Sequence, residues 1–145
     1  MDKTVIIQKL IDKDDKQAYE YAKQIGIESA KIDKYLDMIP DFVSMLNDKN
    51  SFVRARFFIL ICDQARWADD NQIEKVFEQM KPLLNDPKPT VVRQCLNALH
   101  EVALFRPEMS DVIKDAISNI DLSIYKDSMA SLIKKDIDEL MKRID

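Results

Sequence analysis

Apolar residues recur at intervals of three and four positions through most of this chain of 145 residues. That spacing places them on one side of an α-helix and predicts a series of amphipathic helices. The stripes predict eight helices, over residues 3–12, 15–25, 30–46, 51–68, 71–84, 89–105, 108–120 and 127–144. One glycine and five prolines leave few sites for the tight turns of a sheet protein, so the predicted fold class is all-α.

Local signals predict where several of these helices begin and end. Asp14 is expected to cap the second helix at its N-terminus, and Gly26 is expected to end it. Asn71 with Glu74 three residues later has the form of a capping box. Pro40 falls inside the third stripe, where a proline normally kinks a helix. Because the apolar spacing passes through Pro40 without a break, the third stripe predicts one kinked helix.

One stretch of the chain occurs twice and has a fainter third copy. Residues 47–65 and 85–103 each contain an Asn-Asp turn, then Val-Arg, then an apolar run at helical spacing. Arg54 and Arg93 are 39 residues apart, and Arg93 and Lys134 are 41 residues apart. Periods of about 40 residues with two helices each are typical of stacked helical hairpins.

The residues of this stretch resemble the HEAT-repeat pattern. Ile39-Pro40, Asp48 and Val53-Arg54 are similar, in order, to its kinked first helix, its turn aspartate and the Val-Arg that opens its second helix. The chain thus resembles HEAT and armadillo-like proteins, among them small bacterial single-domain HEAT proteins of unassigned role. The resemblance implies a short right-handed α-solenoid of about three HEAT-like hairpins with an N-terminal helical cap. One domain over 1–145 is expected, with the cap at 1–29 and repeats at 30–68, 69–105 and 106–145.

The same resemblance implies a ladder of charged residues between neighbouring repeats. Its members are the turn aspartates Asp48 and Asp86 and the helix arginines Arg54 and Arg93. Physical reasoning agrees, because the aspartate and last-turn carbonyls of one repeat would face the arginine of another. These four residues are therefore expected to be structural, not phosphate-binding.

Composition excludes several classes of function. A net charge of −4 and a pI near 5.1 argue against non-specific nucleic-acid binding, which depends on excess lysine and arginine. Cys62 and Cys95 form no CxxC motif, so neither a zinc site nor a disulfide framework is indicated. No signal peptide is apparent, and no stretch approaches the ~20 apolar residues of a membrane span, so a cytoplasmic location is expected. We find no catalytic constellation, metal site or cofactor site, and predict a protein that is not an enzyme.

Two groups of residues near the apolar sides of helices could carry chemistry instead: His100 with Glu101, and Asp63 with Gln64 and Trp67. His100-Glu101 resembles the His-Glu dipeptides of HEAT-like di-iron hydroxylases, but one pair supplies too few ligands, so a histidine between repeats is predicted. Gln64 and Trp67 lie on the apolar side of their helix, and Asp63 lies on its flank where the next repeat has valine. Burying a carboxylate without a partner is costly. Arg56 is one candidate partner, and the group forms either a functional pocket or a satisfied core.

The second helices of the repeats are expected to lie side by side and to form a concave inner surface. The positions opposite the core on these helices define the predicted interaction surface: Ala55, Phe58, Cys62, Arg66, Gln94, Asn97, Glu101, Lys135 and Asp138. Phe58 is the one large aromatic residue expected there, and exposed aromatic residues often mark binding sites. Function is expected where the repeats disagree, first at Phe58, Asn97 and Asp138.

These observations favour a non-enzymatic protein-interaction module or adapter, whose partner is another protein or a peptide. The alternative is a nucleic-acid-binding protein, because residues 50–56 resemble repeats of HEAT-like glycosylases that remove alkylated bases from DNA. The chain departs from those proteins in its acidic charge and its single tryptophan. The residues available for contacts to phosphate would be Arg54, Arg56, Arg66, Lys88 and Arg106.

Overall fold

Short turns and 3-10 segments join eight α-helices in residues 2–69 and 71–144, the part of the chain that this computed structural model describes. The helices are α1 (Lys3–Leu10), α2 (Asp15–Ser29), α3 (Ile39–Val43), α4 (Ser51–Cys62), α5 (Gln72–Met80), α6 (Pro89–Phe105), α7 (Ser110–Ser118) and α8 (Asp127–Ile144). The 3-10 segments are η1 (Leu36–Met38), η2 (Lys81–Asn85), η3 (Pro107–Met109) and η4 (Leu122–Ile124). The two end residues of the predicted domain, 1 and 145, lie outside the described residues.

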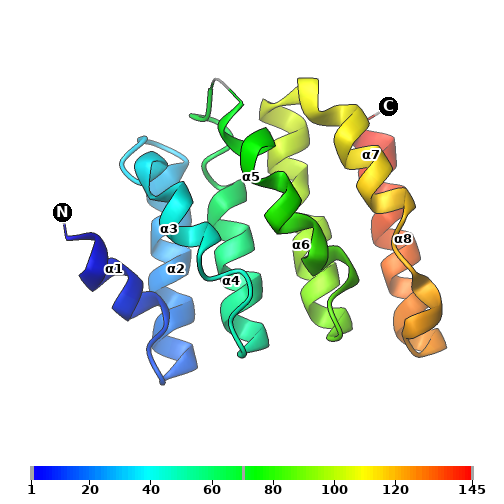
Figure 1. The fold of residues 1–145 in the computed structure, drawn as a ribbon, viewed down its shortest axis with the longest axis horizontal. Coiled ribbons are helices and arrows are strands. Elements are labelled where there is room, and N and C mark those ends of the chain that lie inside the picture. The colour runs from blue at the N-terminus through cyan, green and yellow to red at the C-terminus, as the bar shows by residue number, and fades with distance from the viewer. Residues whose placement is uncertain (1, 70, 145) are drawn as a thin grey trace.

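The helices form two layers (Figure 1). An inner layer consists of α2, α4, α6 and α8, which lie side by side and contact one another in that order. An outer layer of the shorter helices α1, α3, α5 and α7 covers one face of it. This arrangement is a short helical solenoid, and the predicted all-α fold is confirmed.

Capping residues and prolines begin the inner helices, and the cap predicted at Asp14 is present. The Asp14 side chain accepts a hydrogen bond from the Gln17 backbone amide at the start of α2. Asn50 accepts one from Phe52 at the start of α4 in the same manner. Pro89 occupies the first turn of α6, where a missing backbone N–H has no cost. The bounds predicted for the sixth and eighth helices, 89–105 and 127–144, match α6 and α8.

The predicted kinked helix over 30–46 is wrong. The structure has η1 followed by the five-residue α3, and Ile32 is 47 % exposed outside both. Pro40 lies in the first turn of α3, where its ring and absent N–H disturb no helical hydrogen bond. The proline therefore starts a short helix and does not kink a long one.

Two further local predictions are also wrong. Gly26 does not end the second helix, since α2 continues through it to Ser29. Asn71 forms no capping box with Glu74, because its backbone is left-handed (φ 65°) and its side chain makes no capping hydrogen bond. Asparagine tolerates this conformation better than most residues. The helix α4 also ends earlier than predicted, at Cys62, and a run of turns continues to Trp67.

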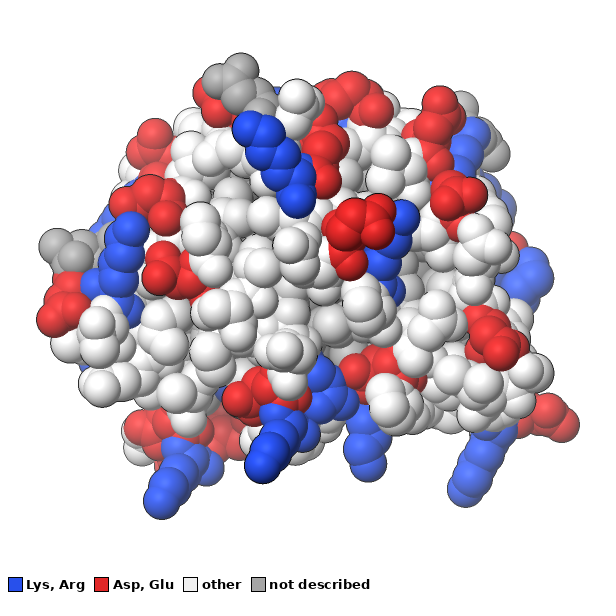
Figure 2. Space-filling model, viewed as in Figure 1, with Lys and Arg blue, Asp and Glu red and all other residues white. Residues whose placement is uncertain are grey.

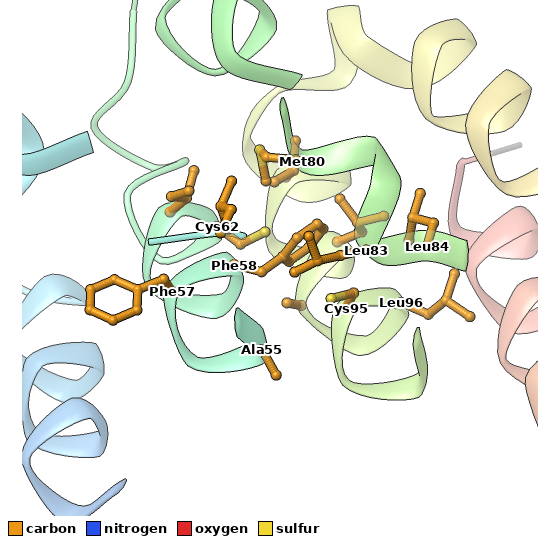
Figure 3. Packing of buried hydrophobic residues seen from close by; sticks show 14 of the residues in the cluster. Ala55, Phe57, Phe58, Cys62, Met80, Leu83, Leu84, Cys95 and Leu96 are labelled. Carbon is orange, nitrogen blue, oxygen red and sulfur yellow. The ribbon is translucent and has the colours of Figure 1, made fainter. Parts of the chain in front are cut away.

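The core is continuous through the array and is densest around α4 and α6. Figure 3 shows Phe58 and Cys62 of α4 among Met80, Leu83 and Cys95, while Phe57 points the other way. Phe57 packs on Phe42 of α3, with ring centroids 5.8 Å apart. Figure 2 shows the face of the outer layer, where residues other than Lys, Arg, Asp and Glu cover much of the surface, charged side chains are scattered among them, and basic side chains project along the lower edge.

Candidate functional site: the α2–α4 groove

A groove with a volume of about 520 Å³ lies between α2 and α4, where the two helices do not close on each other. Its lining, from here on the α2–α4 groove, consists of Asp15, Tyr19, Ala22, Lys23, Gly26, Ile27, Ala30, Phe52, Ala55, Arg56, Ile59, Leu60, Asp63 and Gln94. On α4 the positions 52, 56, 59 and 63 share one side of the helix, and Phe57 lies on the opposite side against α3. The groove therefore opens on the side of the inner layer that faces away from the outer layer.

Large apolar side chains around this groove are exposed to solvent. Phe52 is 61 % exposed, Tyr19 is 56 % exposed and Ile27 is 49 % exposed. Ile59 is half-buried in the wall between them. Single exposed apolar residues are common on protein surfaces, but several of them gathered around one concavity are typical of a binding site.

Arg56 closes the N-terminal end of the groove. Its guanidinium donates to the Leu10 carbonyl oxygen at 2.8 Å and to Asp15 Oδ1 at 2.6 Å, and the side chain is buried. The first contact satisfies a carbonyl at the end of α1, and the second is to the first turn of α2. Arg56 thus joins three helices, and this candidate partner of Asp63 is bound to Leu10 and Asp15 instead.

Asp63 lies near the other end of the groove. It is the C-cap residue of α4, and a Cβ placed on Gly26 would be 3.1 Å from Asp63 Oδ2. Glycine at position 26 therefore lets the backbone of α2 approach the carboxyl group. Burial, and secondarily the nearby charge of Glu101 on α6, raise the pKa of Asp63 from 3.8 to about 7. Within the described residues, no hydrogen bond or ion pair joins its side chain to another group.

The other two residues of the predicted polar group bond to Ser29, with Gln64 buried and Trp67 half-buried. Gln64 Nε2 donates to Ser29 Oγ at 3.0 Å, and Trp67 Nε1 donates to the Ser29 carbonyl oxygen at 2.7 Å. Both contacts fix the end of α4 to the end of α2. Gln64 Oε1 is buried without a hydrogen-bond partner among the described residues, so the buried amide is only partly satisfied. Of the three residues, Asp63 is the one that lines the groove.

Three residues of the predicted interaction surface are buried, which corrects the prediction. Ala55 is 2 % exposed, Phe58 is 0 % exposed and Cys62 is 1 % exposed. Phe58 and Cys62 lie on the side of α4 that packs on α6, so they are covered by the neighbouring helix (Figure 3). Burial raises the pKa of the Cys62 and Cys95 thiols well above the ordinary value, which leaves neither cysteine reactive.

The remaining members of that surface do not form one site. Gln94 lines the α2–α4 groove and Glu101 faces Asp63, whereas Asn97 lies between α6 and α8. The exposed residues Lys135 and Asp138 are on α8, away from the groove. Arg66, in the turns that follow α4, donates to the Ala30 carbonyl oxygen at 2.9 Å and lies 4.5 Å from the Phe105 ring centre.

The predicted ladder residues have the following contacts. Arg54 Nε and Nη2 donate to the two carboxylate oxygens of Asp86 at 2.8 and 3.0 Å. Its third nitrogen, Nη1, donates to the carbonyl of Asp48 at 2.9 Å, while the Asp48 carboxylate accepts from the Asn50 amide. The Arg54–Asp86 pair joins two successive hairpins and is largely buried.

Arg93 makes the corresponding contact to the last hairpin with a partner that the repeat pattern did not indicate. Its Nε donates to Asp136 Oδ2 at 2.7 Å, and Asp136 lies within α8 and not in the turn before it. Nearby, Arg143 Nε donates to His100 Nδ1 at 2.8 Å. Burial, followed by the charge of Arg143, lowers the pKa of His100, so neutral imidazole accepts this bond. His100 therefore lies between repeats.

Four of the five basic residues considered for phosphate contacts are already bound within the protein. Arg54, Arg56 and Arg66 have the partners described above, and Arg106 Nε donates to the Phe105 carbonyl oxygen at 2.6 Å. Lys88 is exposed. In the described ranges 2–69 and 71–144, no cluster of three or more His, Cys, Asp or Glu side chains is placed to hold a metal ion. None of the helices described is both long and apolar enough to cross a bilayer.

The fold and the groove define an all-helical, HEAT-like repeat protein with a concavity between two neighbouring repeats. A comparison with protein families gives the same class more narrowly. The chain belongs to the family described as Cnd1, non-SMC mitotic condensation complex subunit 1, whose sequence profile matches residues 23–142. That match begins within α2 and extends to α8, so it includes most of the groove. No curated protein and no solved structure matches the chain.

Proposed function

We propose that the chain is a protein-interaction module that binds a helical segment of a partner protein in the α2–α4 groove. The observation that carries the proposal is the exposure of Tyr19, Ile27 and Phe52 around a concavity of about 520 Å³. A volume of this size is within the range of about 300–1,000 Å³ that is typical of ligand sites. Aromatic residues that reach a desolvated pocket contribute strongly to binding.

A helix is the segment that suits this space best. The groove runs between two neighbouring helices, and α2, with 15 residues, offers a wall about 22 Å long. An apolar stripe at i, i+3, i+4 and i+7 fits between such walls, as in other helix-in-groove interactions. Within the chain, α4 already packs against one neighbouring helix, α6.

The family supports an interaction role independently of the groove. The description of the Cnd1 family names a subunit of a complex, and a subunit acts through contacts with other proteins. The absence of a metal-binding cluster from the described residues leaves the groove as the feature on which the proposal rests.

The proposal can be tested by selecting binders from a displayed library of 16-residue helical segments and measuring their affinity for two variants of the full chain. Ile27→Ser with Phe52→Ser removes apolar surface from the groove, and both residues are exposed, so the fold should be kept. Leu104→Ser with Ile124→Ser is the matched control, because both are 54–56 % exposed and neither lines the groove. We expect the groove variant to bind selected peptides at least tenfold more weakly, and the control to bind within twofold of the wild type.

Two results would contradict this function. Equal losses in the two variants would mean that the selected peptides bind by non-specific apolar contact. Sedimentation of the chain alone tests a second copy as the occupant. Self-association that disappears in the groove variant, and persists in the control, would replace the separate partner by another molecule of this chain.

A further inference from the structure

Asp63 is the feature of the groove that an apolar partner segment alone does not explain. Its carboxyl group is largely buried at the end of α4, where the helix dipole disfavours negative charge. The helix α2 lies beside it at Gly26, where an added Cβ would be 3.1 Å from Asp63 Oδ2. The carboxyl group is therefore placed where its ionised form is poorly stabilised by the chain itself.

The charged groups around Asp63 do not compensate for this. From α6, Glu101 faces it with the same sign. On α4, Arg56 is bound to Asp15 and to Leu10. In the turns after α4, Arg66 is bound to the Ala30 carbonyl and lies on Phe105. From α2, Asp15 and the exposed Lys23 line the same groove, but neither forms an ion pair with Asp63 within the described residues.

We infer that Asp63 anchors a lysine or arginine side chain of the partner helix, and that the partner carries this basic residue between apolar neighbours. This inference rests on the proposed function of the groove. A carboxylate in a partly desolvated site forms a strong charge-assisted hydrogen bond to such a group. The aliphatic part of lysine or arginine can lie along the apolar walls while the charged end reaches Asp63.

Proton binding at Asp63 should make this interaction depend on pH. With a pKa near 7 the carboxyl group is mostly neutral at pH 6 and mostly ionised at pH 8. The apparent dissociation constant varies inversely with the fraction of protein in the binding-competent form. A partner whose cation needs the ionised form should therefore bind about tenfold more weakly at pH 6 than at pH 8.

The test applies the same 16-residue helical library in parallel to the wild type and to Asp63→Asn, and keeps the peptides that lose affinity for Ile27→Ser/Phe52→Ser. We expect lysine or arginine to be enriched at one central position of the wild-type binders and not among binders of Asp63→Asn. One wild-type binder without histidine is then titrated at pH 6 and pH 8. It should show the tenfold difference with the wild type, and less than a twofold difference once its basic residue is replaced by glutamine.

The outcomes separate the inference from the function on which it rests. Groove-dependent peptides without an enriched basic residue, or with the same enrichment on Asp63→Asn, would overturn the role of Asp63 and leave the groove as an apolar site. A groove-dependent peptide with equal affinity at pH 6 and pH 8 would do the same, using the unmodified chain. Failure to obtain any groove-dependent peptide would instead overturn the proposed function.

Discussion

The helix α4 meets its two neighbours in the inner layer through interfaces of opposite character. With the repeats aligned on Arg54 and Arg93, positions 52, 56, 59 and 63 of α4 correspond to 91, 95, 98 and 102 of α6. We call these four positions the facing row, because each row includes a residue that contacts the preceding inner helix: Arg56 bonds to Asp15 of α2, Cys95 lies beside Phe58 of α4 (Figure 3) and Asp136 bonds to Arg93 of α6. The α6 row is Val91, Cys95, Ala98 and Val102, all buried, and the α4 row is Phe52, Arg56, Ile59 and Asp63. Small apolar residues close one interface, and large or charged ones leave a groove at the other.

The third interface extends the comparison. The facing row of α8, aligned on Lys134, is Leu132, Asp136, Glu139 and Arg143. Two of these residues bond to α6, through Asp136 to Arg93 and Arg143 to His100. The same row of the repeat thus lines an open groove on α4, makes a closed apolar contact on α6 and makes a polar contact on α8. The backbone architecture is shared, and the side chains of one row decide which interface results.

The largest effect expected from this comparison concerns the closed side of α4. Phe58→Ala removes a ring that is 0 % exposed and leaves a cavity against α6. We expect a loss of about 3–5 kcal/mol in the free energy of unfolding. Phe52→Ala, on the groove side and 61 % exposed, should cost less than about 0.5 kcal/mol. Urea denaturation of both variants measures the contrast, and equal losses would contradict the assignment of the two sides.

The next effect compares the two arginines that join successive hairpins. Arg54→Met leaves the Asp86 carboxylate, 5 % exposed as a side chain, without its main partner, so we expect a loss of about 3 kcal/mol. Arg93→Met should cost about 1 kcal/mol or less, because Arg93 is 39 % exposed and Asp136 is 24 % exposed. Urea titrations measure both losses. Similar values for the two variants would show that burial of the ion pair is not what separates them.

The apolar spacing was sufficient to predict the all-α fold because it depends on local sequence, and the resemblance to HEAT repeats was sufficient to predict a helical solenoid. The prediction of the exposed side of α4 was wrong because of a geometrical assumption. The prediction took the side opposite Val53 as free, which placed Phe58 and Cys62 at the surface. An inner helix of a solenoid has neighbours on three sides, so only a narrow row remains open. That row faces α2 at Phe52 and Asp63.

A signal for the groove was nevertheless present in the alignment of repeats. Asp63 stands where the next repeat has Val102, and a carboxylate at a position that is otherwise apolar needs a partner or an opening. The prediction that function lies where the repeats disagree thus also applies to Asp63. It was made for Phe58, however, and not for the facing row. Which row is open depends on how neighbouring helices are rotated, and that is decided by packing between repeats and not by any one helix.

Replacing Asp63 should change the free energy of unfolding by a smaller amount, and it should stabilise the chain. The folded chain holds this proton more tightly than the unfolded chain, since the pKa rises from 3.8 to about 7. The stabilisation from the neutral form is complete below pH 4 and is lost as the pH rises to about 7. The asparagine side chain of Asp63→Asn does not ionise, so this variant should be more stable than the wild type by about 2 kcal/mol at pH 8. The full pKa shift corresponds to ~4 kcal/mol, and the expected value is lower because the groove is partly solvated.

Chemical denaturation between pH 4 and pH 8 measures this difference, which should shrink steadily toward pH 4. Asp138→Asn is the control, since Asp138 is exposed on α8 and its ion pair with Lys134 is also exposed. That variant should stay within about 0.5 kcal/mol of the wild type at every pH. A constant offset for Asp63→Asn would mean that its carboxyl group is not neutral in the folded chain.

The smallest effect tests how closely α2 approaches α4 at the end of the groove. In an exposed helix interior, replacing glycine by alanine gains about 1 kcal/mol. At Gly26 the new Cβ would lie 3.1 Å from Asp63 Oδ2, so the carboxyl group must shift and the gain should be smaller. In an Asp63→Ala background the contact is absent, and Gly26→Ala should recover the full gain. The coupling in this double-mutant cycle should be about 0.5–1 kcal/mol.

The control compares Gln24→Gly with Gln24→Ala at an exposed position of the same helix, and it measures the difference in helix propensity between glycine and alanine. Additive effects would mean that Gly26 is not required by Asp63, and that the narrow end of the groove is set by other contacts between α2 and α4.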